Sequence, residues 1–166
     1  MTAPRRFRMA ALALLSFVAA GSAYGDDLHK LWDQRCGGCH GHAGTFSRDT
    51  LLLVDGHLGD RKGRDVEAFL KSHNGGYSPE VVAGIANMLR AQVETPDLFR
   101  RLCAQCHETA AVVARTLLSV EDGVLVGRQS HLPLAEVLRR HGDAEEDQQG
   151  PLLETLTRVE REVHHR

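Results

Sequence analysis

The strongest constraint on this chain is a five-residue pattern that occurs twice, "CGGCH" at residues 36–40 and "CAQCH" at residues 103–107. The sequence contains four cysteines, and the two copies use all of them. No cysteine is therefore left for a separate stabilising disulfide. Whatever these thiols and imidazoles do, the chain does it in two places.

The residues around the two motifs also match. Cys36 and Cys103 lie 67 residues apart, and at this offset several flanking residues coincide. Three such matches are Leu31-Trp32 with Leu98-Phe99, Asp55-Gly56 with Asp122-Gly123 and, after one inserted residue, His73 with His141. Self-similarity at a fixed spacing indicates duplication. We therefore expect two domains, residues 26–93 (the first unit) and residues 94–166 (the second unit).

The N-terminal segment, residues 1–25, has the pattern of a secretory signal peptide. Arg5, Arg6 and Arg8 precede an apolar stretch at residues 9–20, and small residues follow it. About 12 apolar residues are too few to span a bilayer, which needs roughly 20. The mature chain contains no second apolar run of that length. We expect an exported protein without a membrane span, located in the periplasm or otherwise outside the cytoplasm.

The charge balance limits the partners. The full chain carries 20 Lys and Arg against 22 Asp and Glu, and loss of the three early arginines makes it more acidic. Nucleic-acid-binding proteins instead carry basic patches that neutralise phosphates. Nucleic acid is therefore not an expected partner.

Each unit shows the same coarse helical pattern. A short helix begins after a capping residue (Asp26 or Asp27, and Thr95 in the second unit) and leads into the cysteine motif. A glycine-containing loop follows, and then a second helix at residues 64–73 or 133–141. A third helix begins at Ser78-Pro79 in the first unit and after Pro151 in the second. Because no strand pattern is strong enough to build a sheet, we expect an all-α fold.

Three kinds of site use this cysteine pattern or part of it. A thioredoxin-like redox centre needs neighbouring parallel strands, which we do not expect here. A zinc site needs four ligands, normally from closely spaced pairs, and the separation of the two pairs disfavours zinc without excluding it. Covalent haem uses Cys-x-x-Cys-His itself, because two thiols one helical turn apart reach the two vinyl groups of a porphyrin. A haem in each unit would also supply the apolar interior that so small a domain lacks.

Each unit resembles a small class I-type cytochrome c domain, in which helices wrap a covalently attached haem. The resemblance covers essentially the whole mature chain, and the Cys-x-x-Cys-His motif is its specific part. It implies two covalently attached c-type haems with iron. It also implies thioether bonds at Cys36, Cys39, Cys103 and Cys106 and proximal iron ligands at His40 and His107.

The distal iron ligands are predicted from the repeat. The family often uses a methionine before the last helix, but the second unit contains no methionine. His73 and His141 follow the proximal histidines by 33 and 34 residues, and His141 lies where the family places its distal ligand. We therefore expect bis-histidine ligation, with Met88, His57 and His131 as rival ligands and Met88 more suited to core packing. The histidines that we expect to face water are His29, His164 and His165.

These expectations combine into one function. The sequence predicts an exported dihaem cytochrome c that relays single electrons between redox partner proteins, and therefore a carrier rather than an enzyme. The alternative is a haem enzyme or gas-binding protein, peroxidase-like or binding O₂, NO or CO, with one five-coordinate haem.

Overall fold

The computed structural model describes residues 27–141 and 144–164. The predicted signal peptide at residues 1–25 lies outside the described residues, as do Asp26 and His165. Within the described ranges, no helix combines the length and apolar character that crossing a bilayer requires.

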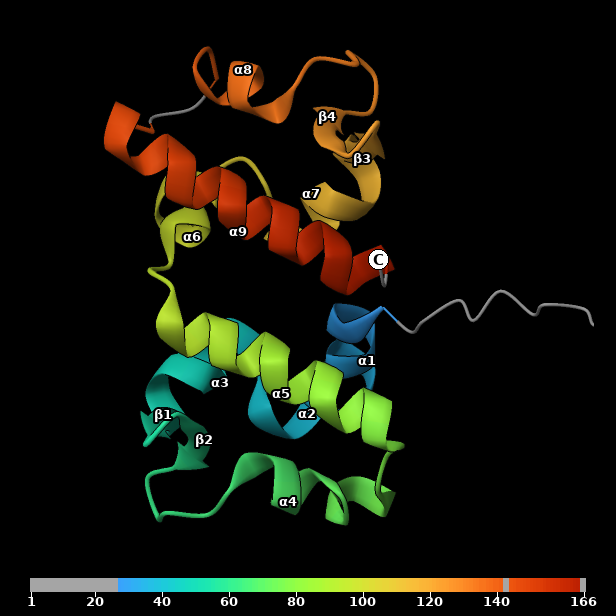
Figure 1. Ribbon diagram of the computed structural model, residues 1–166, viewed down its shortest axis with the longest axis vertical. Coiled ribbons are helices and arrows are strands. Elements are labelled where there is room, and N and C mark those ends of the chain that lie inside the picture. Colours follow the sequence, from blue (N-terminus) through green and yellow to red (C-terminus); the bar gives the residue numbers. More distant parts are fainter. Residues whose placement is uncertain (1–26, 142–143, 165–166) are drawn as a thin grey trace, which may run out of the picture.

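A similar order of elements occurs twice along the chain, although the described residues of the second series include no counterpart of α2 or η1 (Figure 1). The first series is α1 (Leu28–Arg35), α2 (Gly37–His40), α3 (Ala43–Thr50), β1 (Leu51–Val54), β2 (His57–Asp60), α4 (Val66–Leu70), the 3₁₀ turn η1 (His73–Gly75) and α5 (Pro79–Glu94). The second is α6 (Leu98–Leu102), α7 (Ala110–Leu117), β3 (Leu118–Glu121), β4 (Val124–Gly127), α8 (Leu134–Leu138) and α9 (Glu146–His164). The exact limits of the two domains stay predictions.

The expectation of an all-α fold is wrong, because each series contains an antiparallel two-stranded sheet. β1 pairs with β2 and β3 with β4, and in each hairpin the strands are joined by Asp-Gly. Asp55 and Gly56 have φ values of 49° and 78°, and Asp122 and Gly123 have 49° and 79°. Two consecutive positive φ angles characterise a type I′ turn, whose twist matches that of paired strands. The fold is thus mixed, predominantly helical with two small hairpins.

The helix boundaries agree with the sequence at some positions and not at others. Asp27 caps α1 and Ser78 caps α5 with Pro79 behind it, which confirms these two predicted starts. α6, however, begins at Leu98 after Asp97 instead of at Pro96. α9 begins at Glu146, so that Pro151 lies inside the helix and not at its start. The helices α3 and α7 were not expected. The sequence predicted a loop after each motif, and these helices occupy part of it.

A separate apolar core fills each series of elements. Trp32, Leu58, Ile85, Met88 and Leu89 are buried in the first, where the long helix α5 covers α1, α3 and α4. In the second, α9 packs across α6, α7 and α8. Buried residues recur at matched positions: Leu51 with Leu118, Leu58 with Leu125 and Leu70 with Leu138. Figure 1 shows α5 and α9 across the middle of the molecule, with α4 and α8 at its opposite ends.

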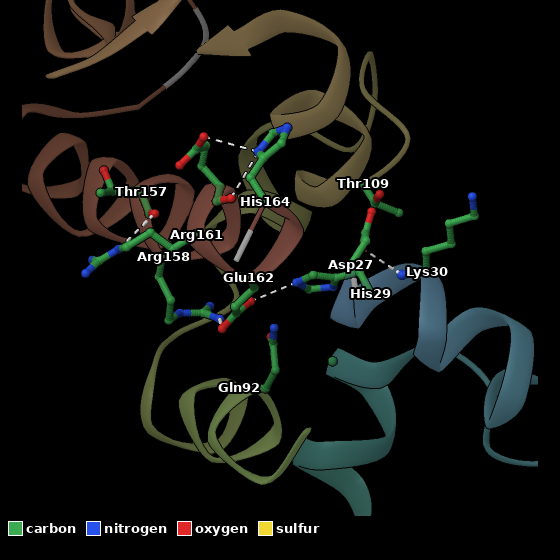
Figure 2. A network of polar contacts seen from close by, with 12 residues as sticks. Asp27, His29, Lys30, Gln92, Thr109, Thr157, Arg158, Arg161, Glu162 and His164 are labelled. Carbon is green, nitrogen blue, oxygen red and sulfur yellow. Dashed lines mark hydrogen bonds and ion pairs between the residues drawn. The ribbon is translucent and has the colours of Figure 1, made fainter. Parts of the chain in front are cut away.

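Charged side chains join the two halves where α1 meets α9 and α7. His29 Nε2 lies 2.8 Å from Glu162 Oε2, and Glu162 also pairs with Arg158 at 2.6 Å (Figure 2). The Arg115 guanidinium donates two hydrogen bonds to Asp27, of 2.5 and 3.0 Å. The expectation that His29 faces water is therefore wrong: its side chain is 12% exposed and contributes to this junction.

Candidate functional site

The two cysteine motifs share the same pair of backbone hydrogen bonds, although only the first forms a helix, α2. In the first, the N–H of Cys39 and of His40 donate to the Cys36 carbonyl, at 3.1 and 2.9 Å. In the second, Cys106 and His107 donate to the Cys103 carbonyl at the same two distances. Bonds from residues three and four positions ahead form one tight helical turn. The two thiols of a motif therefore lie one helical turn apart, and the histidine follows at the end of that turn.

Each motif histidine faces the distal histidine that the sequence predicts. The ring centres of His40 and His73 are 6.0 Å apart with an interplanar angle of 58°, and those of His107 and His141 are 5.9 Å apart at 64°. Metal–imidazole bonds are about 2.0–2.1 Å long, so one metal ion between two facing imidazoles separates their ring centres by roughly 6 Å. Both pairs therefore have the spacing of two axial ligands of one metal.

A cavity of about 460 Å³ contains the first pair. Cys36, Cys39, His40 and His73 all line it. Its other walls are mainly apolar and aromatic: Trp32, Phe46, Leu51, Val66, Phe69, Leu70 and Leu89. A mostly apolar cavity with a few convergent polar groups is typical of a cofactor site.

The leading cysteine of each motif is the more buried of its pair. Cys36 is buried and Cys103 half-buried, whereas Cys39 and Cys106 are exposed, and all four are free of disulfide bonds. Burial raises the pKa of the Cys36 thiol, although a hydrogen bond with Tyr77 and the charge of Arg35 act in the opposite direction. Burial also raises the pKa of Cys103. A nucleophilic redox cysteine instead has a lowered pKa.

The three rival ligands lie elsewhere. Met88 is fully buried on α5 among the first core residues, which confirms the packing role that its pattern suggested. His57 is exposed on β2. The His131 ring lies 2.8 Å from a Glu121 carboxylate oxygen, in an exposed ion pair at the second hairpin.

Several aromatic neighbours of the first pair were not identified from the sequence. Phe46 of α3 meets the His40 ring edge-on at 4.7 Å between ring centres, and Phe69 of α4 stacks on His73 at 4.5 Å. Trp32 packs against both Phe46 and His40, and its indole N–H donates to the Gly41 carbonyl. The sequence shows only that these residues are aromatic. Contact with a particular histidine depends on the chain's tertiary path, which the residue types do not reveal.

The histidine pairs involve few other donors. Within residues 27–141 and 144–164, no three or more His, Cys, Asp and Glu side chains converge as a metal cluster would require. Each site thus offers two imidazoles to a metal, with two thiols at its edge. Comparison of the chain with protein-family models, with curated proteins and with solved structures finds no match.

Proposed function

We propose that the protein is an exported dihaem c-type cytochrome that relays single electrons between redox partner proteins. The observation that carries the proposal is the pairing of His40 with His73 and of His107 with His141 at nearly equal ring separations. Each pair includes the histidine of a Cys-x-x-Cys-His motif. The recurrence of one ring separation in both units favours a metal cofactor between each pair of imidazoles over chance contact.

The donor set fits haem better than zinc. A structural zinc ion takes four protein ligands, usually with cysteine thiolates among them. A haem iron receives four nitrogens from its porphyrin and leaves two axial positions for the protein. The two imidazoles of each site match that requirement, and the adjacent thiols match covalent attachment.

The residues of the chain have separable roles in this proposal. Cys36 and Cys39 would hold one haem and Cys103 and Cys106 the other, while the paired histidines would bind the irons. When bound, each haem supplies reversible one-electron chemistry between ferric and ferrous iron. The largely apolar walls of the first cavity would surround the haem, and together with histidine ligation they would tune its reduction potential.

Haem attachment can be tested directly by intact-mass analysis of protein made with a cytochrome maturation system. We expect the mature chain to carry the added mass of two haems. The double variant Cys36→Ala/Cys39→Ala and its counterpart Cys103→Ala/Cys106→Ala should each carry one. An unmodified wild-type chain would refute the proposal.

The ligand assignment requires a second measurement. We expect near-infrared and low-temperature magnetic spectra of the oxidised protein to show two low-spin bis-histidine haems. His73→Ala and His141→Ala should each abolish one of these signals, whereas His57→Ala should leave both. Persistence of both signals in the two distal variants would show that other residues bind the irons.

A further inference from the structure

The surroundings of the distal histidine differ between the two sites, and the first site is the more elaborate. The Phe69 ring stacks on His73 with ring centres 4.5 Å apart and planes inclined by 28°. Arg64 Cζ lies 4.9 Å from the centre of the Phe69 ring, within cation–π distance. Asp60 Oδ2 in turn fixes Arg64, accepting from Nη2 at 2.6 Å and from Nε at 2.7 Å. His73 thus rests on a stack that extends to the end of β2.

A second contact secures the backbone that carries His73. Asn74 Nδ2 donates to the Arg35 carbonyl at 3.0 Å and to the Tyr77 hydroxyl at 3.1 Å. Arg35 directly precedes Cys36, so this amide links the distal loop to the start of the cysteine motif. Asn74 has φ 53°, a left-handed conformation that asparagine tolerates better than most residues. The position therefore suits asparagine both for its side chain and for its backbone.

The second unit lacks every side chain of this arrangement. The isolated bridges Gly59–Asp65 and Val126–Pro133 align the two units after their hairpins, and the matching ends of the hairpins give the same alignment. By that alignment the second unit has Gly127 for Asp60, Leu132 for Arg64, Val137 for Phe69 and Gly142 for Asn74. None of these residues has the ring, the charge or the amide that its counterpart uses. Within the described part of the chain, His141 is exposed and its one ring neighbour is His107.

We propose that the two sites are functionally unequal: His73 is a fixed distal ligand, His141 is a displaceable one, and the second site binds small exogenous ligands such as carbon monoxide. The inference rests on the proposed function, because it assumes that both histidine pairs bind haem iron. The exchange would involve no change of oxidation state: the His141 imidazole would give up its place on ferrous iron with its lone pair, and carbon monoxide would supply the replacing electron pair. Phe69 and Asn74 are positioning residues that oppose the same exchange at His73.

Carbon monoxide is the probe for the first experiment. Reduced wild-type protein should bind about one molecule rapidly, at the second site. The haem of the first site should respond about tenfold more slowly, the effect of one aromatic contact expressed as a rate. The double variant Cys36→Ala/Cys39→Ala, which keeps only the second haem, should retain the fast phase. The counterpart Cys103→Ala/Cys106→Ala should lose it. Equal rates at the two sites, or a faster first site, would overturn the inference.

Exchanging the supporting residues provides the decisive comparison. Phe69→Val with Asn74→Gly gives the first site the residues of the second and should raise its rate of carbon monoxide binding about tenfold or more. Phe69→Tyr keeps a stacking ring and should behave as wild type, as should Lys71→Ala, an exposed neighbour. Unchanged binding in the double variant would contradict the proposed clamp.

A spectroscopic readout distinguishes positioning from general loosening of the fold. Phe69→Val should alter the low-temperature magnetic signal of the first haem, because that signal depends on imidazole orientation, and should leave the signal of the second unchanged. Intact mass is measured first on every variant. A chain without haem overturns the proposed function and this inference together, whereas two haems with equal reactivity overturn the inference alone.

Discussion

At the residue scale, Asp27 combines a structural and an electrostatic role. Its carboxylate caps α1 through the Lys30 N–H and receives two hydrogen bonds from Arg115. Burial alone raises the pKa of Asp27, but the hydrogen bonds from Arg115 and Lys30, with the charges of Arg115 and His29, outweigh it and hold the pKa below its ordinary value. The folded state therefore favours the ionised form of this carboxyl group.

This lowered pKa predicts a pH-dependent stability. Above the unfolded-state pKa of about 3.9 the stabilisation is complete, and it is lost as the pH falls through the lower folded-state pKa. Asparagine caps helices as well as aspartate does, so Asp27→Asn removes mainly the charge. We expect Asp27→Asn to lower the free energy of unfolding by about 1–2 kcal/mol at neutral pH, with the difference vanishing in acid.

Denaturant unfolding of wild type and variant from neutral to acidic pH measures this difference. Asp49→Asn, which changes an exposed carboxylate on α3, serves as the control and should stay within about 0.5 kcal/mol at every pH. A gap between wild type and Asp27→Asn that is independent of pH would show that the charge is not its source.

Met88 provides a prediction on ligation as well as on packing. Its side chain is fully buried in the first core, so a leucine of similar volume should cost less than about 1.5 kcal/mol of unfolding free energy. We expect Met88→Leu protein to keep both low-spin haem signals. Magnetic spectra and thermal unfolding of the same sample test both statements, and loss of one signal would make Met88 an iron ligand.

At the scale of elements, the hairpins depend on their glycines. Gly56 and Gly123 have φ values of 78° and 79°, and a Cβ at either would meet no atom within 4 Å. An alanine at either position is therefore destabilising only through its left-handed backbone conformation, by about 1–2 kcal/mol. We expect Gly56→Ala and Gly123→Ala each to lower the unfolding free energy by that amount in denaturant titrations.

Gly150 offers a helical control. It lies exposed within α9 directly before Pro151, and a Cβ there meets no atom within 4 Å outside its two chain neighbours. The gain in helix propensity is opposed by the Pro151 ring, which crowds the Cβ of the preceding residue. Gly150→Ala should therefore change the unfolding free energy by less than about 1 kcal/mol. Equal destabilisation by all three substitutions would indicate that the turn conformation is not the cause.

The elements also show how far the sequence could be interpreted. The caps at Asp27 and Ser78 were predictable because their signals are local. The hairpins could also have been found, since Asp-Gly between apolar residues is a strong hairpin signal and its repetition was visible at Asp55 and Asp122. Strands of four residues, however, are too short for alternation to distinguish them from loops.

The candidate site, like the fold, was only partly predictable from the sequence. The proximity of His40 to His73 was predictable from the repeat, because in each unit a histidine follows the motif histidine by 33 or 34 residues. Phe69 and Asn74 were not predictable as supports of His73, since each acts through a contact that exists only once the chain is folded. Their absence from the second unit is visible in the sequence but acquires meaning only from the geometry of the first.

At the scale of the whole molecule, the junction between α1 and α9 rests on ion pairs that the sequence did not reveal. His29 and Glu162 lie far apart in the chain, yet the side chains of both are only 12% exposed in the folded protein. Interactions between residues in direct contact typically couple by about 0.5–3 kcal/mol. We expect the cycle of His29→Gln, Glu162→Gln and the double variant to yield a coupling energy in this range.

Unfolding free energies of the four proteins determine that coupling. Arg158 also pairs with Glu162, so the cycle isolates the histidine contribution from the arginine contribution. Additive effects of the two substitutions would show that these side chains do not stabilise the junction together.

The helices α4 and α8 lie at opposite ends of the molecule, which has a consequence for where partner proteins would dock (Figure 1). The loops that carry His73 and His141 follow these two helices, so the two distal histidines lie near opposite ends of the molecule. In the proposed relay, an electron donor docked at one end and an acceptor docked at the other would therefore not compete for one surface.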